Sequence, residues 1–172
     1  GGLGINTLNA SAFTAGAVSL YSNGGKDTLK GGSASDQFYI DVTGLNQGEK
    51  VSIDAGAGSD MIYLLGAGSL DGADLQWLQL TGGSTAQIVF KGARGETQTV
   101  SGNLTLAGGN LSFEYETFDL NGKTIDTSGG QAGSITIKGS HINLSNGSLL
   151  ALGGNVSNNG AINIIAEDLF TD

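Results

Sequence analysis

The sequence predicts an all-β protein, a parallel β-solenoid of short strands separated by corners rich in Gly and Asn. Three observations support this fold class. The 172 residues contain 31 Gly and no Pro, and charged residues make up only 13% of the chain, well below the roughly 25% of an ordinary globular domain. Short runs alternate apolar and polar residues, as strands with one buried face do. Similar segments also recur at the spacing of one solenoid coil.

The first half contains a repeated nine-residue unit. Residues 22–30 (SNGGKDTLK), 31–39 (GGSASDQFY) and 55–63 (AGAGSDMIY) approximate the pattern G-G-x-G-x-D-x-U-x, in which U is a large apolar residue. The glycines permit a tight turn that exposes backbone carbonyls, the Asp supplies a carboxylate, and U begins a strand that fills the core. The units are imperfect, because Ser22 and Asn23 replace the first two glycines of the pattern.

The aspartates of these units are candidate calcium ligands, because Ca²⁺ takes six to eight oxygen ligands. Two nine-residue units make one coil, so Asp36 and Asp60 are expected on the same edge, one coil apart. Asp27 is expected on the opposite edge, where Glu49 or Asn46 completes a weaker site. The predicted calcium site comprises Asp36, Asp60, Gly32, Ala34, Gly56, Gly58 and Asp27.

Aspartates are dense in this half of the chain, where residues 27–74 contain seven of the eleven. Such density favours a cation between the carboxylates, since unpaired like charges repel. Asp71 and Asp74 form a degenerate candidate turn, whereas Asp41 and Asp54 each follow a strand and are expected to be exposed corner residues.

The second half contains three aligned segments, residues 102–111 (GNLTLAGGNL), 133–142 (GSITIKGSHI) and 160–169 (GAINIIAEDL). Their starts lie too far apart for a hairpin and suit one coil of a solenoid with several sides. We therefore expect Leu104, Ile135 and Ile162 to form one inward row. A β-sandwich is the competing fold.

A finer seven-residue spacing runs through the same region, from Leu104 to Ile125 and from Ile135 to Val156. A heptad coiled coil has this spacing too. It is disfavoured by repeated Gly-Gly and Asn-Gly pairs, because each Gly in a helix interior costs about 1 kcal/mol relative to Ala. Short strands joined by corners are the better interpretation.

Residues 22–63 resemble the haemolysin-type calcium-binding (RTX) repeats of type I secreted bacterial proteins. Residues 102–166 are similar to the coils of filamentous-haemagglutinin-like β-helix adhesins, in GNLTL, TIDTSGG, GSITIKGSHINLSNGSLL and GAINI. The resemblance implies one solenoid domain over 1–172, with calcium-binding coils in 22–80 and haemagglutinin-like coils in 81–172. It also implies a module of a large bacterial surface protein, located outside the cell, that binds one or two Ca²⁺.

Net charge and composition exclude several classes of binding partner. The net charge of −9 argues against nucleic acid and anionic membranes and is compatible with cations. No segment approaches 18 consecutive apolar residues, so no membrane insertion is expected. The absence of Cys removes disulfides and thiolate metal sites. Because the first residues include neither Met nor the basic segment of a signal peptide, we expect a piece of a longer chain.

The expected function is a non-enzymatic structural module of an adhesin or matrix protein whose folding is assisted by calcium. Its expected partners are neighbouring modules or stacked copies, with polysaccharide or a host-surface receptor as further candidates. The alternatives are a polysaccharide-binding or polysaccharide-processing β-helix, such as a lyase or epimerase, and a filament-forming subunit. The candidates for a catalytic role are His141 and the loop KGARGE (91–96). The simpler interpretation is an exposed corner residue for His141 and a solvated loop for KGARGE. Trp77 is expected in the core or at a coil edge.

Overall fold

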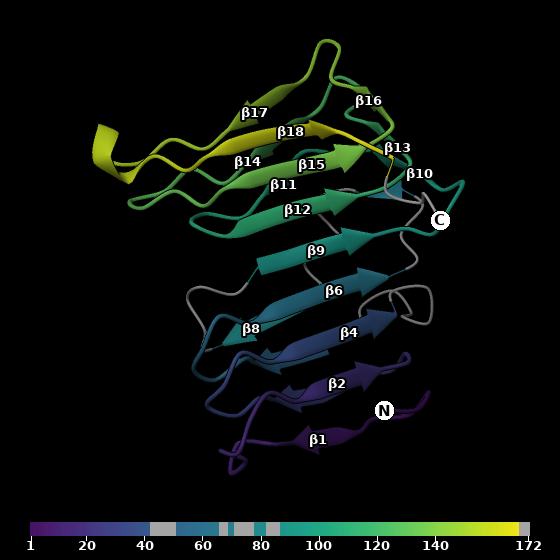
Figure 1. The fold of residues 1–172 in the computed structure, drawn as a ribbon, viewed down its shortest axis with the longest axis vertical. Coiled ribbons are helices and arrows are strands. Elements are labelled where there is room, and N and C mark those ends of the chain that lie inside the picture. Colours follow the sequence, from purple (N-terminus) through teal and green to yellow (C-terminus); the bar gives the residue numbers. More distant parts are fainter. Residues whose placement is uncertain (42–50, 66–68, 71–77, 82–86, 169–172) are drawn as a thin grey trace. The chain divides into compact units, whose positions relative to one another are not determined.

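A computed structural model confirms the predicted all-β fold and its parallel, solenoidal strand arrangement (Figure 1). It describes residues 1–41, 51–65, 69–70, 78–81 and 87–168. By contacts the chain forms two compact units, unit 1 (residues 1–66 and 73–88) and unit 2 (residues 67–72 and 89–172). In the described residues the helical structure is one short 3-10 turn, η3 (Val156–Asn158), and no helix there is long and apolar enough to span a bilayer.

Unit 1 is a two-sided coil in which the chain alternates between two parallel sheets. One sheet has the order β1 (Thr7–Asn9), β3 (Thr28–Lys30), β5 (Val51–Asp54) and β8 (Leu78–Thr81). The other contains β2 (Ser19–Ser22), β4 (Gln37–Asp41) and β6 (Met61–Leu65). Each nine-residue unit thus contributes one strand, and two units complete a coil, as the repeat predicts.

Unit 2 is a three-sided coil with a parallel sheet on each side. The first sheet contains β7 (Ser69–Leu70), β10 (Thr97–Val100), β13 (Thr117–Asp119) and β16 (His141–Asn143). The second contains β11 (Leu104–Thr105), β14 (Thr124–Asp126) and β17 (Ser148–Leu150). The third contains β9 (Gln87–Lys91), β12 (Asn110–Glu114), β15 (Ile135–Gly139) and β18 (Ile162–Ala166).

The seven-residue spacing in unit 2 is the distance from one side of the coil to the next. Leu104, Leu111 and Phe118 begin or occupy strands on three different sides, and all three are fully or almost fully buried. Equivalent residues of successive coils pair in register, as Leu111 does with Ile135 and Phe118 with Ile142. The heptad-like pattern therefore comes from three short strands and their corners.

One predicted row is wrong. Ile162 pairs with Ile135 as expected, but Leu104 pairs with Ile125 on another side of the coil. The place below Ile135 is taken by Leu111. The error came from taking the step between GNLTL and GSITI as one coil, whereas residues that face each other across these coils, such as Asn110 and Ser134, are 24 residues apart.

Aromatic rings fill the centre of unit 2. Phe90 and Phe113 stack with their centroids 4.9 Å apart and their planes at 6°, and Phe118 lies 5.1 Å from Phe113 in a tilted arrangement. All three side chains are fully buried. Burying one Phe contributes about 1.5–3 kcal/mol, and a ring pair adds about 0.5–1.5 kcal/mol.

A crowded corner leads into the third sheet of unit 2. A glycine lies two residues before the first apolar residue of the strand in three successive coils, at Gly109, Gly133 and Gly160. The backbones of these three glycines lie directly over one another. A Cβ atom at Gly133 would lie 1.9 Å from the carbonyl oxygen of Gly109, and one at Gly160 would lie 1.9 Å from that of Gly133. Only Gly lets the coils approach this closely at the corner.

We predict that Gly133→Ala destabilises the protein by more than about 1 kcal/mol, because the coils must separate to admit the methyl group. Gly130→Ala is the matched control, since a Cβ atom there meets nothing within 4 Å. Urea unfolding followed by circular dichroism measures both changes. Equal stabilities of the two variants would contradict the crowded corner.

Candidate functional site

The three predicted aspartate ligands all lie immediately before strands and are 1% exposed. Asp36 precedes β4 and Asp60 precedes β6, and the register of these strands stacks Asp60 on Asp36 in the next coil. Asp27 precedes β3 in the other sheet of unit 1. The structure therefore brings Asp36 and Asp60 together and places Asp27 apart from them.

Glycine determines how these two turns stack. Gly56 and Gly58 have φ angles of +82° and +120°, which residues with a Cβ atom rarely adopt. A Cβ atom at Gly56 would lie 2.2 Å from the carbonyl oxygen of Gly32, and one at Gly58 would lie 2.6 Å from that of Ala34. The carbonyls of one turn thus lie directly against the backbone of the next.

The buried carboxylates accept hydrogen bonds from the backbone of the preceding coil. The Oδ1 atom of Asp36 accepts from the N–H of Val18 at 2.9 Å, and the Oδ1 atom of Asp60 accepts from the N–H of Asp36 at 2.9 Å. The Oδ2 atom of Asp36 accepts from Gly32 N–H at 2.6 Å. The bonds from Gly32 and Asp36 satisfy buried backbone donors that are costly to leave unpaired, and the bond from Val18 satisfies a partly buried one.

Asp27 has the same role on the other side of unit 1. Its Oδ1 atom accepts from the N–H of Asn6 at 2.8 Å, and its Oδ2 atom accepts from the hydroxyl of Ser22 at 2.8 Å. This structural role was not predicted from the sequence, in which Asp27, Asp36 and Asp60 are candidate calcium ligands. The available signal was an Asp directly before a strand in successive coils.

Asp60 differs from its two counterparts because one of its oxygens is unsatisfied. Its Oδ2 atom is buried and has no hydrogen-bond partner among the residues that the structure describes. Burial raises the pKa of Asp60, and the negative charge of Asp36 raises it further, while the hydrogen bond from the Asp36 N–H opposes both effects. The Asp36–Asp60 edge therefore holds two buried carboxylates whose negative charges oppose each other.

The donor set at this edge suits Ca²⁺ in chemical type. Two carboxylates and the carbonyl oxygens of Gly32 and Ala34 are hard oxygen ligands, which Ca²⁺ prefers. In the part of the chain that the structure describes, no three His, Cys, Asp or Glu residues gather closely enough to hold a metal ion. A cation at this edge would have two carboxylates and backbone carbonyls as its ligands, as the repeat implies.

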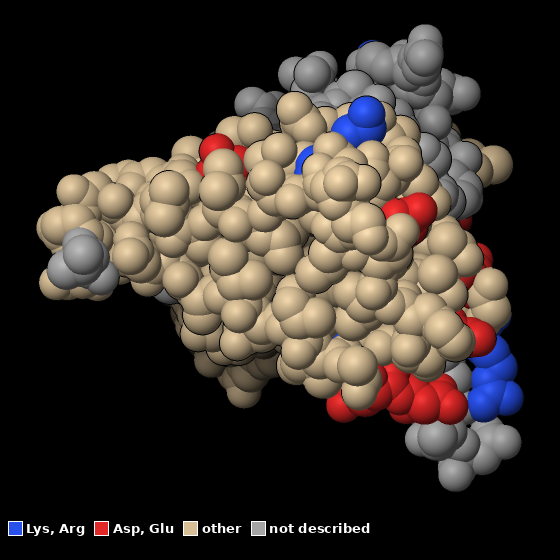
Figure 2. Space-filling view, turned by 90° about the horizontal axis from the view of Figure 1, so that it is seen from above, with Lys and Arg blue, Asp and Glu red and all other residues tan. Residues whose placement is uncertain are grey.

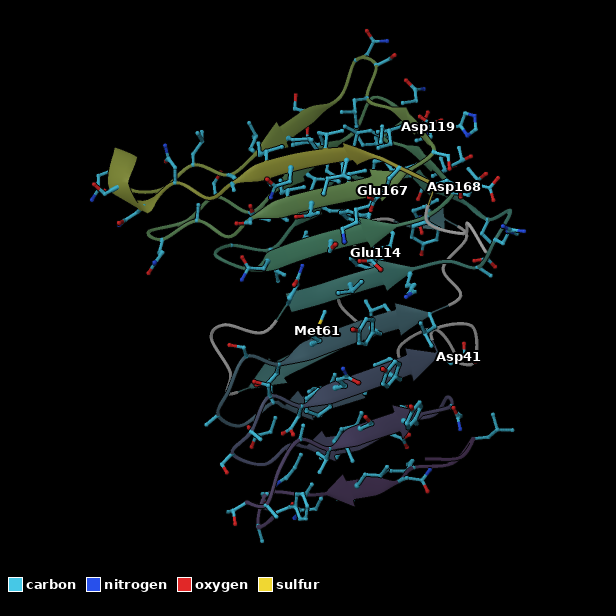
Figure 3. The ribbon with its side chains drawn as sticks, in the orientation of Figure 1. Asp41, Met61, Glu114, Asp119, Glu167 and Asp168 are labelled. Atoms are coloured by element: carbon cyan, nitrogen blue, oxygen red, sulfur yellow. The ribbon has the colours of Figure 1, made fainter. Side chains whose placement is uncertain are left out.

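The remaining predicted acids are distributed elsewhere. Asp41, labelled in Figure 3, ends β4, and Asp54 ends β5, and both are half-buried rather than fully exposed. Neither lies in the turns that contain Asp36 and Asp60. The other expected participants lie outside the described residues, namely Asn46, Glu49, Asp71, Asp74 and Trp77.

A tyrosine stack on the outer face of β2, β4 and β6 was not anticipated. Tyr21 and Tyr39 have ring centroids 4.6 Å apart, and Tyr39 and Tyr63 have centroids 4.8 Å apart, with planes within 11° of parallel. Each inner ring face is covered by its neighbour, and the hydroxyls of Tyr39 and Tyr63 donate to Gln37 Oε1 at 2.9 Å and Met61 Sδ at 3.4 Å. The low aromatic content of 6% concealed this stripe, because three of the four Tyr share one register position.

Unit 2 contains a pocket of about 490 Å³ at the carboxyl ends of β9, β12, β15 and β18. It is lined by Arg94, Gly95, Glu116, Ser140, His141 and Asp168; Asp168, labelled in Figure 3, follows β18. The Oε2 atom of Glu116 accepts from the N–H of Gly95 at 2.7 Å, and its carbonyl oxygen accepts from the N–H of His141 at 3.0 Å.

Four successive coils thus bring the charged loop 91–96 and the only His to one place. The sequence concealed this convergence, because the residues concerned are more than twenty positions apart along the chain. His141 and Arg94 of the loop KGARGE, expected at an exposed corner and in a solvated loop, both line this pocket. An arginine, two carboxylates and an imidazole form a site of mixed charge.

Comparisons with known proteins found no matching family model, curated protein or solved structure. The parallel solenoid fold is consistent with β-helix repeats.

We predict that burial and the charge of Asp36 make ionised Asp60 destabilising in the absence of calcium. Folding raises the pKa of Asp60 above its ordinary value of 3.8. The protonated carboxyl therefore contributes its full stabilisation of the folded state at pH values below 3.8. The contribution is lost as pH rises through the raised pKa. In chelator, Asp60→Asn should therefore gain stability relative to the wild type as pH rises from about 3 to about 7.

Urea unfolding at a series of pH values measures this difference. Asp54→Asn is the control, because it removes the same charge from a half-buried strand end in the same unit. A stability difference between Asp60→Asn and wild type that does not change with pH would contradict the assigned titration.

Proposed function

We propose that this chain is a non-enzymatic structural module of a secreted or surface-exposed bacterial adhesin or matrix protein, and that calcium assists its folding. The observation that carries the calcium proposal is the buried Oδ2 atom of Asp60, which lies beside Asp36 and has no hydrogen-bond partner in the described part of the chain. The observation that carries the structural role is the regular coil-on-coil pairing in each unit.

Electrostatics supports calcium at the Asp36–Asp60 edge. An ionised carboxylate in a buried site is costly unless it is paired, and Asp60 lies one coil above a second carboxylate. A bound Ca²⁺ supplies two positive charges to these oxygens. The hydrogen bonds from Val18 and Asp36 N–H groups already fix the orientation of the two carboxylates, so less ordering is required when an ion binds.

Coupling of folding to export from the cell follows from the charges of the same two aspartates. Where calcium is scarce, repulsion between Asp36 and Asp60 disfavours the stacked turns of unit 1. Where calcium is abundant, the free energy of binding adds to the free energy of folding. The resemblance of residues 22–63 to repeats of secreted proteins supports this direction, and that of residues 102–166 to adhesin coils supports a location on the cell surface.

A mechanical role is supported by how the coils are held together. Parallel strands pair with the coils before and after them in both units, and side chains such as Asn110 and Ser134 add bonds between coils at the corners. In such an arrangement each coil is stabilised by its neighbours.

We predict that calcium raises the melting temperature of the wild type. At a calcium concentration of 100 times the dissociation constant, the stabilisation is about 2.7 kcal/mol, or about 5–11 °C for a chain of this size. Asp60→Asn should lose most of this gain, whereas Asp54→Asn should keep it. Differential scanning calorimetry in calcium and in chelator measures the three proteins.

Two outcomes would contradict the proposal. A wild-type melting curve that is the same in calcium and chelator removes the calcium-assisted folding. An equal calcium gain in Asp60→Asn and wild type places the ion elsewhere. Magnesium is a useful comparison, because it demands near-octahedral geometry and suits an irregular carbonyl-rich turn less well.

A second candidate function, saccharide binding, is favoured by the pocket of unit 2. Carboxylates such as Glu116 and Asp168 accept hydrogen bonds from sugar hydroxyls, and Arg94 donates them. The volume of about 490 Å³ is within the range of small-molecule sites. The tyrosine stack offers less support, because neighbouring rings cover both faces of Tyr39 and one face each of Tyr21 and Tyr63.

We predict that a neutral oligosaccharide binds this pocket and that Arg94→Ala weakens binding about tenfold, the effect of losing a hydrogen bond to a charged group. Lys123→Ala is the control, since Lys123 is also a cation of unit 2 and does not line the pocket. Isothermal titration calorimetry against a panel of oligosaccharides measures both. Failure of the wild type to bind any of them rejects this candidate.

A further inference from the structure

The outer face of β2, β4 and β6 in unit 1 carries a row of phenols in contact. Tyr21 pairs in register with Tyr39, and Tyr39 pairs with Tyr63. The ring centroids are 4.6 and 4.8 Å apart, as neighbouring strands are. Successive coils thus each place one phenol against the next, and Tyr39 has a phenol on both of its faces.

Hydrogen bonds orient two of these phenols in the same direction. The Tyr39 hydroxyl donates to Gln37 Oε1 at 2.9 Å, and the Tyr63 hydroxyl donates to Met61 Sδ at 3.4 Å. Gln37 and Met61, the latter labelled in Figure 3, are also partners in the register of β4 and β6. Because the rings are nearly parallel and the hydroxyls point the same way, the ring carbons beside the two hydroxyls lie over one another.

The row is open to solution on its outer side. Tyr39 and Tyr63 are half-buried, although each is covered by at least one neighbouring ring. Tyr115, the fourth tyrosine of the chain, is fully buried in unit 2. A soluble oxidant therefore has access to phenols that are already in contact, whereas Tyr115 is shielded from it.

Other means of linking one coil to the next through side chains are limited in this chain. It contains no Cys, so no disulfide can join its coils. It has only seven Lys and Arg to pair with acids of neighbouring coils, and few of these basic side chains appear on the described surface in Figure 2. The tyrosine row, by contrast, places identical oxidisable side chains in contact on successive coils.

We propose that this row is a site of oxidative cross-linking, at which the Tyr39 ring forms a carbon–carbon bond with the ring of Tyr21 or Tyr63. The oxidant is hydrogen peroxide used by a haem peroxidase, a class of enzyme that removes one electron at a time from phenols. The resulting dityrosine joins two successive coils of unit 1, as a disulfide does in chains that contain Cys. This modification goes beyond the proposed function and involves none of the predicted calcium ligands.

The reaction balances with one molecule of hydrogen peroxide. Each of two phenols loses one electron and one proton and becomes a phenoxyl radical, and these electrons and protons reduce the peroxide to two molecules of water. The radicals couple through the ring carbons beside their oxygens. The hydrogens on those carbons then move to the oxygens and restore both hydroxyls. The product has two hydrogen atoms fewer than the two tyrosines.

Proximity favours coupling within one molecule. Radicals on different molecules must meet by diffusion, whereas neighbours in the row are in contact before they are oxidised. The new bond joins ring edges, so the two rings must turn out of their stacked arrangement, and the open outer side of the row permits this. Because Tyr39 has a partner on each face, removal of one partner leaves the other.

Conservative variants identify the residues that couple. Tyr39→Phe keeps an aromatic ring at the centre of the row and removes the phenol that both pairs share. Tyr21→Phe and Tyr63→Phe each remove one pair and leave the other. Tyr115→Phe is the control, because it removes a phenol that is buried in unit 2 and does not belong to the row. Circular dichroism melting curves check that all four variants fold.

Each protein is treated in dilute solution with a haem peroxidase and limiting hydrogen peroxide, and mass spectrometry of intact protein and of peptides measures the products. We expect the wild type and Tyr115→Phe to yield monomers that lack two hydrogen atoms. In the wild type, the peptide of Tyr39 should be joined to that of Tyr21 or Tyr63. Oxidation of Met61 is distinguished because it adds an oxygen atom.

The variants of the row should differ from one another. Tyr39→Phe should lose the internal cross-link, whereas Tyr21→Phe and Tyr63→Phe should each retain it through the remaining pair. The cross-linked wild type should also melt at a higher temperature than the untreated protein, because a covalent bond between distant residues restricts the unfolded chain.

Other results overturn the proposal. A treated wild type that loses no hydrogen atoms, or in which only different molecules become joined, shows that neighbours in the row do not couple. An internal cross-link in Tyr39→Phe that is as abundant as in the wild type places the bond elsewhere. The calcium response is measured on untreated protein, so that failure of the cross-link leaves the proposed function standing.

Discussion

The register between successive coils is the constraint on which the other features of this chain depend. A parallel strand must pair along its whole length with the strand one coil earlier, and a slip of one residue would turn every inward side chain outward. Correct register stacks Asp60 on Asp36 in unit 1 and Ile135 on Leu111 in unit 2. The buried carboxylates, the crowded glycine corner, the tyrosine stack and the pocket all follow from this stacking.

The all-β fold class, and the coil made of two nine-residue repeats in the first half, could be predicted because they depend on local sequence patterns. Alternation identifies strands, and the nine-residue unit contains its own turn, acid and core residue. The same locality explains why Asp36 and Asp60 could be assigned to one edge. Their hydrogen bonds could not be foreseen, because the donors, such as Val18 N–H, belong to backbone whose position depends on the register.

Predictions that required the exact length of a coil were less successful. Leu104 was assigned to the row of Ile135 because similar sequences were assumed to occupy the same side, whereas three sides of one coil carry similar strands. Convergence of Arg94, Glu116 and His141 depends on the same lengths, summed over several coils. Such sites become visible only when the register is known, because nothing in the neighbouring sequence marks them.

The stacked tyrosines have a consequence for observing this molecule. Rings less than 5 Å apart and nearly parallel couple their electronic transitions, so Tyr21, Tyr39 and Tyr63 act together as one chromophore. The fourth tyrosine, Tyr115, is buried in unit 2 and is separate from this group. The near-ultraviolet circular dichroism of these tyrosines therefore depends on the spacing between β2, β4 and β6, and it reports that spacing without any added label.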